Sequence, residues 1–289
     1  MIAPDIPMAA SKQDPNIGTY NAPAVVEYYA ALDYLTPCEQ FLFDTHLKPG
    51  MSILDLGVGG GRTTPYLSSI AGRYVGVDYA GEMIAACRKK FPQLQFEVGD
   101  AADLSRFTAS TFDAVVMAFN GIDYLVPDEA RIRALHQIWR LLKPKGIVIF
   151  SSHNPRSIWA RASWNPQRVR RLAEATVRRD SALFPVLIAF LTALRVSLAR
   201  LQAAMRSLGR SARRLPTRVF WRGQGYLMDP AHGGLITHLA TPEHVEHELS
   251  ALGFQQLRVL GEDYPRISGR YVTRWYYYVF SKTAASGEK

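Results

Sequence analysis

The stretch that decides the fold is 53-ILDLGVGGGR-62, in which an apolar run passes into four glycines within five positions. Glycines remove the β-carbons that would hold a ligand away, and a strand that turns into a helix presents free N–H groups. A dinucleotide fingerprint counted from Gly57 would need its third glycine at position 62, which is Arg62. Asp55, just before the glycines, would repel a pyrophosphate but attract a cation. The stretch therefore predicts a turn that binds a cationic ligand.

Two further acids follow the next two predicted strands. Asp78 comes 17 residues after Gly61, where its carboxylate can accept both hydroxyls of a ribose. Asp100 can accept a hydrogen bond from an adenine amino group, and the small Ala101 leaves room for the ring. Each acid alone would equally suit a solvated strand end. Together with the glycine turn, they predict S-adenosylmethionine, a nucleoside with a sulfonium and no phosphate, as the ligand.

Strands and helices alternate along most of the chain. The ranges expected as strands are 52–56, 74–77, 94–98, 112–118, 147–151, 256–260 and 274–281. The ranges expected as helices are 63–70, 81–90, 128–142 and 241–252, preceded by a helical region at 20–48 that Pro37 divides. Nearly all-apolar strands between helices indicate a parallel sheet covered on both faces. The expected fold is α/β, a doubly wound Rossmann-like sheet, mostly parallel with an antiparallel late strand, plus a helical insertion after the fifth strand.

The chain is expected to divide into five parts. They are a flexible N-terminal arm (1–19), a helical cap (20–48), a core (49–155 and 236–282), an arginine-rich insertion (156–235) that is a lid or an interface, and a flexible tail (283–289). Cys38 and Cys87 form no disulfide framework or metal spacing, the N-terminus lacks the pattern of a secretory signal, and no uncharged apolar run reaches the ~18 residues needed to span a bilayer. We therefore expect a cytoplasmic protein without a metal site, either free or peripheral at the inner face of the membrane.

Five segments resemble the successive motifs of class I S-adenosylmethionine-dependent methyltransferases, most closely the small-molecule branch that includes quinone and sugar methyltransferases. They are ILDLGVGGGR, YVGVDYAGEMIAACRKK, GDAADL, FDAVVMAFN and IWRLLKPKGIVIFSSHN. The resemblance covers residues 20 to 154 and implies S-adenosyl-L-methionine as cofactor and methyl transfer as activity. It implies these roles: Gly57, Gly59 and Gly61 face the methionine part, Asp55 its amino group, Asp78 the ribose, Tyr79 and Met83 the adenine faces, Asp100 and Ala101 the adenine edge, Phe119 and Asn120 the methionine and sulfur, and Tyr20 covers the cofactor. Gly60 departs from the pattern, which commonly has a larger residue there, and is expected to loosen the turn.

The acceptor is less defined than the cofactor. Candidate bases are His153, His232, His238 and Asp123. His153 follows the fifth strand and so lies at the active rim, although a capping role is the alternative. Candidate acceptor-pocket residues are Tyr124, Arg156 and His232, whereas His244 and His247 are expected on a solvated helix face. The predicted acceptor is a small molecule or is linked to a lipid or glycan, and the methylated atom stays open between O, N and C. Rival hypotheses are a non-catalytic scaffold that binds S-adenosylmethionine, an RNA methyltransferase and a nicotinamide oxidoreductase.

The positive charge is concentrated in one segment. The chain has a formal charge of +9, whereas residues 161–222 hold fourteen Arg, no Lys, one Glu and one Asp. Within it, residues 182–214 predict a helix with an apolar stripe on Leu187, Leu191, Leu194, Leu198, Leu201, Met205 and Leu208. Such a helix suits an anionic membrane surface; a lid over the acceptor and a homodimer interface are the alternatives. DNA is an improbable substrate, because FNGIDY stands where amino-methylating DNA enzymes carry Asn/Asp-Pro-Pro-aromatic.

Overall fold

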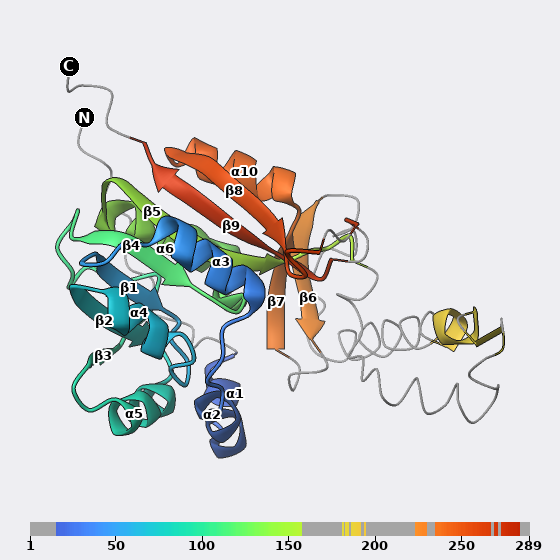
Figure 1. The fold of residues 1–289 in the computed structure, drawn as a ribbon, viewed down its shortest axis with the longest axis horizontal. Coiled ribbons are helices and arrows are strands. Elements are labelled where there is room, and N and C mark those ends of the chain that lie inside the picture. The colour runs from blue at the N-terminus through green and yellow to red at the C-terminus, as the bar shows by residue number, and fades with distance from the viewer. Residues whose placement is uncertain are drawn as a thin grey trace.

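A computed structural model describes residues 16–157, 181, 183–184, 186–191, 194, 223–229, 235–266, 269–270 and 273–283. Its centre is a seven-stranded sheet (Figure 1), made of β1 (Ser52–Leu56), β2 (Arg73–Asp78), β3 (Gln95–Val98), β4 (Phe112–Met117), β5 (Leu142–His153), β8 (Phe254–Gly261) and β9 (Trp275–Lys282). The strand order is β3-β2-β1-β4-β5-β9-β8. The first five strands are parallel, and β9 is antiparallel to both β5 and β8. The predicted fold class is confirmed.

Helices cover both faces of the sheet because alternate residues of each strand point to opposite sides. Leu54 belongs to a cluster with residues of α6 (Asp128–Leu141) and α10 (Pro242–Ala251). Ile53 belongs to a second cluster with residues of α3 (Pro37–His46), α4 (Thr64–Ile70) and α5 (Gly81–Lys90). Ile53 and Leu54, which are adjacent in β1 and face opposite sides, are both fully buried. The carboxyl ends of β1, β2 and β4 consequently meet at one edge, where open α/β sheets bind ligands.

Local sequence signals determine where the helices begin. Thr36 accepts from the Glu39 backbone N–H while the Glu39 side chain accepts from the Thr36 N–H, a complete capping box ahead of α3. Pro37 is therefore the first residue of α3, and the helical region expected over 20–48 is divided ahead of it. Thr241 likewise caps α10, as expected from its position before Pro242.

The N-terminal region packs closer to the core than expected. Residues 17–20 form α1 (Ile17–Tyr20), followed by α2 (Pro23–Ala30). Asn16 is 1% exposed, and its Nδ2 donates to the carbonyls of Tyr124 and Ile236. Residues 16–19 are therefore folded against the core and not part of the flexible arm expected over 1–19, and residues 1–15 lie outside the described residues.

One hairpin was not anticipated from the sequence. β6 (Gln224–Asp229) pairs antiparallel with β7 (Leu235–Ala240) in a separate two-stranded sheet that projects beside the end of β5 (Figure 1). Its closely spaced glycines and its Asp-Pro read as a turn. The hairpin returns the chain from the arginine-rich insertion to the core, beside the short 3-10 helix η1 (Gly121–Tyr124). Within the part of the chain that the structure describes, no helix is long and apolar enough to cross a bilayer.

Candidate functional site

A pocket opens at the carboxyl ends of β1, β2 and β4. It encloses about 960 Å³, including open solvent at its mouth. Its lining is Tyr20, Tyr29, Leu56, Gly57, Val58, Gly59, Gly60, Arg62, Thr63, Asp78, Tyr79, Met83, Gly99, Asp100, Ala101, Met117, Ala118, Phe119, Gly121, Tyr124 and Leu125. Nine of the twelve residues predicted for the cofactor lie in this lining; Asp55, Gly61 and Asn120 do not.

The glycine turn and Asp78 form one hydrogen-bonded unit. Asp78 Oδ2 accepts from the Gly59 N–H at 2.8 Å and Oδ1 from the Ala80 N–H at 2.9 Å. Burial raises the pKa of Asp78, and these backbone donors oppose the rise. Gly57 and Gly59 have backbone φ angles of +71° and +54°, which residues other than glycine rarely adopt. A β-carbon on Gly59 would meet nothing within 4 Å. Such a β-carbon would take up space in the pocket instead of packing against protein.

The other two glycines serve packing. A β-carbon on Gly61 would lie 2.8 Å from the Phe91 ring, so Gly61 accommodates α5 and its C-cap rather than a ligand. A β-carbon on Gly60 would lie 2.3 Å from the Ala30 backbone N and 2.4 Å from the Tyr29 backbone carbon. The expectation that Gly60 loosens the turn is wrong in this respect, because its missing side chain lets the end of α2 contact the turn directly. That contact brings Tyr29 into the pocket lining.

Asp55 lies behind the pocket wall. It is 1% exposed, and its Oδ2 accepts from Thr63 Oγ1 at 2.7 Å and from Tyr74 OH at 2.9 Å. Burial raises the pKa of Asp55 to about 6, although both hydroxyl donors oppose the rise. Thr63, which the sequence analysis did not select, lines the pocket in its place. Asp55 therefore stabilises the wall of the pocket from behind. It does not line the pocket, where the amino group of the cofactor was expected to contact it.

Tyrosines cover one side of the pocket. The Tyr20 ring lies 6.2 Å from Tyr29, 6.0 Å from Tyr79 and 5.8 Å from Tyr124, centroid to centroid. Burial among these rings raises the pKa of Tyr20 well above its usual range, so the phenol stays neutral. Because Tyr20 and Tyr29 come from α1 and α2, the N-terminal helices complete the pocket.

A buried ion pair supports the pocket wall at Arg62. Arg62 donates to Glu39 at 2.7 and 2.6 Å, and the two side chains are 6% and 2% exposed. The guanidinium lies 4.5 Å from the centre of the Phe119 ring. Phe119 and Asn120 both adopt the left-handed conformation, with φ of 57° and 61°. Two such non-glycine residues in succession are uncommon and typical of functional sites.

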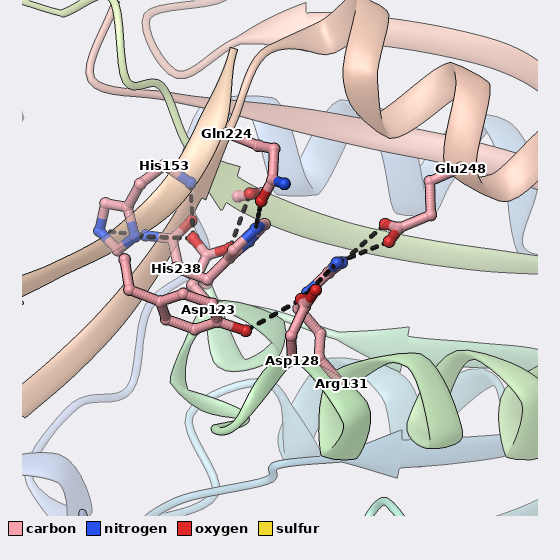
Figure 2. A network of polar contacts seen from close by, with 10 residues as sticks. Asp123, Asp128, Arg131, His153, Gln224, His238 and Glu248 are labelled. Carbon is pink, nitrogen blue, oxygen red and sulfur yellow. Dashed lines mark hydrogen bonds and ion pairs between the residues drawn. The ribbon is translucent and has the colours of Figure 1, made fainter. Parts of the chain in front are cut away.

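A second cluster of polar residues includes Asp123, His153 and His238 (Figure 2). Asp123 is the residue before Tyr124, which lines the pocket. Asp123, in η1, is fully buried, and its Oδ2 accepts from the backbone N–H and from Nδ1 of His153, at 2.6 and 2.7 Å. Its Oδ1 accepts from Ser152 Oγ at 2.7 Å, with His238 Nδ1 3.8 Å away. The ring of Tyr124 lies 6.1 Å from that of His153, perpendicular to it. His153 therefore lies one residue beyond the pocket lining.

The remaining predicted residues have different surroundings. Arg156 pairs with the exposed Glu243 at 3.0 Å, outside the pocket. His238 is 1% exposed, with Nε2 3.2 Å from Gln224 Oε1, so it has no access to solvent. His247 is exposed as expected, whereas His244 is half-buried. His232 lies outside the described residues. Among the described residues, no group of three His, Cys, Asp or Glu is arranged to hold a metal ion.

Comparison with known proteins identifies the core. A family model described as "Methyltransferase domain" matches residues 53–146. Residues 53–146 are a class I S-adenosylmethionine-dependent methyltransferase domain. This range contains the glycine turn and all three rim acids, so the predicted family and its cofactor class are confirmed.

Curated relatives share this domain at low identity. The human mitochondrial ubiquinone biosynthesis O-methyltransferase is 32% identical over 112 residues, which is 36% of this chain and 29% of that protein. A demethylmenaquinone methyltransferase of Beutenbergia cavernae is 30% identical over 102 residues, 35% of this chain and 40% of that protein. The match thus spans less than half of either relative.

Solved methyltransferase structures share the fold over most of the chain. The 1,6-didemethyltoxoflavin-N1-methyltransferase of Burkholderia thailandensis superposes with a TM-score of 0.55, covering 97% of this chain and 93% of that one at 15% identity. A methyltransferase of Methanosarcina mazei gives a TM-score of 0.54, covering 87% and 99% at 17% identity.

Proposed function

We propose that the whole protein transfers a methyl group from S-adenosylmethionine to a hydroxyl group of a small-molecule acceptor. The observation that carries the proposal is the placement of His153 beside the pocket, with Nδ1 bonded to a buried carboxylate and Nε2 on the opposite edge of the ring. A hydroxyl acceptor needs a base, whereas a more acidic carbon or an amine needs little help. The name of the human relative, an O-methyltransferase, agrees with this acceptor class.

The pocket residues fit the proposed cofactor. Asp78 lines the pocket and suits the ribose hydroxyls, while Gly57 and Gly59 leave the backbone bare for the methionine part. Asp100 and Met83 also line the pocket and suit the edge and a face of adenine. When bound, S-adenosylmethionine supplies a methyl group on a cationic sulfur with a neutral leaving group. The protein would align the acceptor oxygen with that methyl, exclude water with the tyrosine cover and accept the acceptor's proton at His153.

The test is transfer of isotope-labelled methyl from S-adenosylmethionine to small phenols, with 3,4-dihydroxybenzoate as first probe and a cell extract as the unbiased acceptor source. We expect labelled small-molecule product, and we expect His153→Ala to lower turnover about 10²–10⁴-fold with little change in cofactor affinity. Label in RNA alone would favour the RNA methyltransferase hypothesis. Binding without transfer to any fraction would favour the scaffold.

We propose further that the insertion docks on an anionic membrane surface, which would give access to an amphipathic acceptor. Four apolar residues at helical spacing are exposed: Leu183, Val186, Phe190 and Leu194, at 64%, 63%, 62% and 47%. This stripe differs from the predicted one, because Leu187 and Leu191 are half-buried and only Leu194 belongs to both; the rest of the predicted stripe lies outside the described residues. The surrounding sequence supplies the fourteen arginines.

The membrane proposal is tested by sedimentation with vesicles. The protein should sediment with phosphatidylglycerol vesicles, not with phosphatidylcholine vesicles, and added salt should release it. Changing Arg195, Arg200, Arg206 and Arg210 to Gln should abolish sedimentation and leave cofactor affinity unchanged. Equal behaviour with both vesicle types would leave the lid or the homodimer interface as the role of this segment.

A further inference from the structure

Asp123 is a buried carboxylate beside His153 and His238 (Figure 2). Its two oxygens accept from Ser152 Oγ, from the backbone N–H of His153 and from Nδ1 of His153, and His238 lies 3.8 Å away. It is 0% exposed and absent from the pocket lining. Asp123 was a candidate base on sequence grounds, but a carboxylate with these partners and no exposure cannot meet an acceptor molecule.

The geometry suits orientation of His153 instead. One oxygen, Oδ2, accepts both the backbone N–H and Nδ1 of the same residue, which restrains both torsions of the imidazole side chain. Although burial raises the pKa of Asp123, the hydrogen bond from His153 and the nearby His238 hold it below its ordinary value, so the group is ionised. An imidazole nitrogen that faces a carboxylate carries the proton, which leaves the lone pair of the neutral ring on Nε2.

A second residue faces Nε2. Asn120 Nδ2 lies 3.3 Å from it, and the other end of that amide, Oδ1, is buried with no hydrogen-bond partner among the described residues. The Asn120 backbone is held by donation of its N–H to Ser151 Oγ at 2.8 Å. Rotating the amide by half a turn exchanges its donor for its acceptor. Asn120 can therefore donate to a neutral Nε2 and accept from a protonated one. Its predicted role along the cofactor gives way to a contact with His153.

We propose that Asp123 and Asn120 are positioning residues that hold the two ring nitrogens of His153, so that Nε2 takes the proton of the acceptor hydroxyl. This inference rests on the proposed function. The Asn120 N–H first leaves the single Nε2 lone pair to the acceptor O–H. As the bond from acceptor oxygen to methyl carbon forms and the bond from that carbon to sulfur breaks, the oxygen keeps the O–H electron pair and its proton passes to Nε2. Rotation of the Asn120 amide then satisfies the new N–H until solvent takes the proton.

The first test needs no acceptor. The full chain, labelled with ¹⁵N-histidine and saturated with S-adenosylhomocysteine, is examined by NMR at about pH 8, where unperturbed histidine is neutral. His153→Gln identifies the signals of His153 among the seven histidines. We expect His153 to carry its proton on Nδ1, and Asp123→Asn to convert the ring to a mixture of tautomers. A proton on Nε2 in the wild-type protein, or an unchanged tautomer in Asp123→Asn, would overturn the proposal.

Two variants separate positioning from packing. Ser152→Ala removes another donor to Asp123 without touching the imidazole, so the His153 tautomer should stay unchanged. Asn120→Asp replaces the amide with acceptor oxygens only, so both ring nitrogens of His153 should be protonated under the same conditions. If Ser152→Ala disturbs the tautomer as much as Asp123→Asn, the carboxylate is a structural group. If Asn120→Asp leaves the ring neutral, Asn120 has no such role.

Turnover provides a second readout, with whichever small phenol accepts the labelled methyl. Asp123→Asn should lower kcat about 100-fold or more, while KM for S-adenosylmethionine changes less than about threefold, as expected when the base loses its orientation. Ser152→Ala should cost less than about tenfold. Loss of turnover in His153→Ala but not in Asp123→Asn would overturn the positioning role alone. Full turnover in His153→Ala would contradict the base assigned in the proposed function.

Discussion

Glu39→Gln tests whether the buried pair of Glu39 and Arg62 supports the pocket wall. Glutamine has the same shape and can keep one oxygen toward the Thr36 N–H and one Arg62 nitrogen, which now lie 2.8 and 2.7 Å from Oε2. Its amide nitrogen would then face the other Arg62 nitrogen, now 2.6 Å from Oε1, donor to donor. The Arg62 charge, on a side chain 6% exposed, would lose its counter-ion.

Removing one partner of a buried pair costs about 3–5 kcal/mol, and the retained hydrogen bonds place this case near 3 kcal/mol. That is a large share of the 5–15 kcal/mol that stabilises an average domain. The assay is urea unfolding, with Glu97→Gln as control because the Glu97 pair with Arg106 has side chains 28% and 38% exposed. The control should cost less than about 1 kcal/mol. Equal costs in both variants, or an unchanged cost of Glu39→Gln when Arg62 is already Met, would refute the reasoning.

Three further changes have outcomes fixed by the structure. Gly60→Ala should lower the melting temperature and weaken S-adenosylhomocysteine binding, because its β-carbon meets α2 backbone at 2.3 Å; Gly81→Ala, with nothing within 4 Å, should do neither. Burial raises the pKa of Asp55 to about 6, so its contribution to stability is complete below the ordinary value near 4 and is lost as pH rises through 6. Asp55→Asn should remove that decline in urea unfolding between about pH 4 and 7.5. Asp113→Asn should change the pH dependence in the opposite direction. Burial raises the pKa of Asp113, but Lys143 and the Ser52 N–H hold it below its ordinary value. The wild-type carboxylate therefore loses its stabilising effect on acidification, a loss that the variant should not show in the same unfolding assay.

The rim of the pocket could be predicted because it depends on local patterns. Glycines that follow an apolar strand, and an acid at the end of a strand, are enough to predict Gly59, Asp78 and Asp100 as ligand-binding residues. This prediction needs no knowledge of the rest of the chain. The parallel sheet then brings these strand ends to one edge, and the structure places all three residues in one pocket.

Contacts between distant side chains could not be predicted in this way. Glu39 in α3 pairs with Arg62, and Asp123 in η1 accepts a hydrogen bond from His153. Both contacts depend on how the elements pack and on the rotamers that the packing allows. The position of Asp55 in the sequence suggested contact with a ligand, but in the fold the side chain is buried and its Oδ2 accepts hydrogen bonds from Tyr74 and Thr63. The β6–β7 hairpin was missed because its glycines read as a turn, and His238 was consequently considered as a base rather than as a buried partner of Asp123.

Calorimetric titration with S-adenosylhomocysteine and with NADH tests the central claim most directly, namely that the pocket at the glycine turn holds S-adenosylmethionine. We expect S-adenosylhomocysteine to bind at one site per chain and NADH not to bind. Asp78→Ala should weaken the binding by about 1.5–3 kcal/mol, or roughly 10- to 150-fold, as for loss of charge-assisted hydrogen bonds. Binding of NADH without S-adenosylhomocysteine, or unchanged affinity in Asp78→Ala, would contradict it.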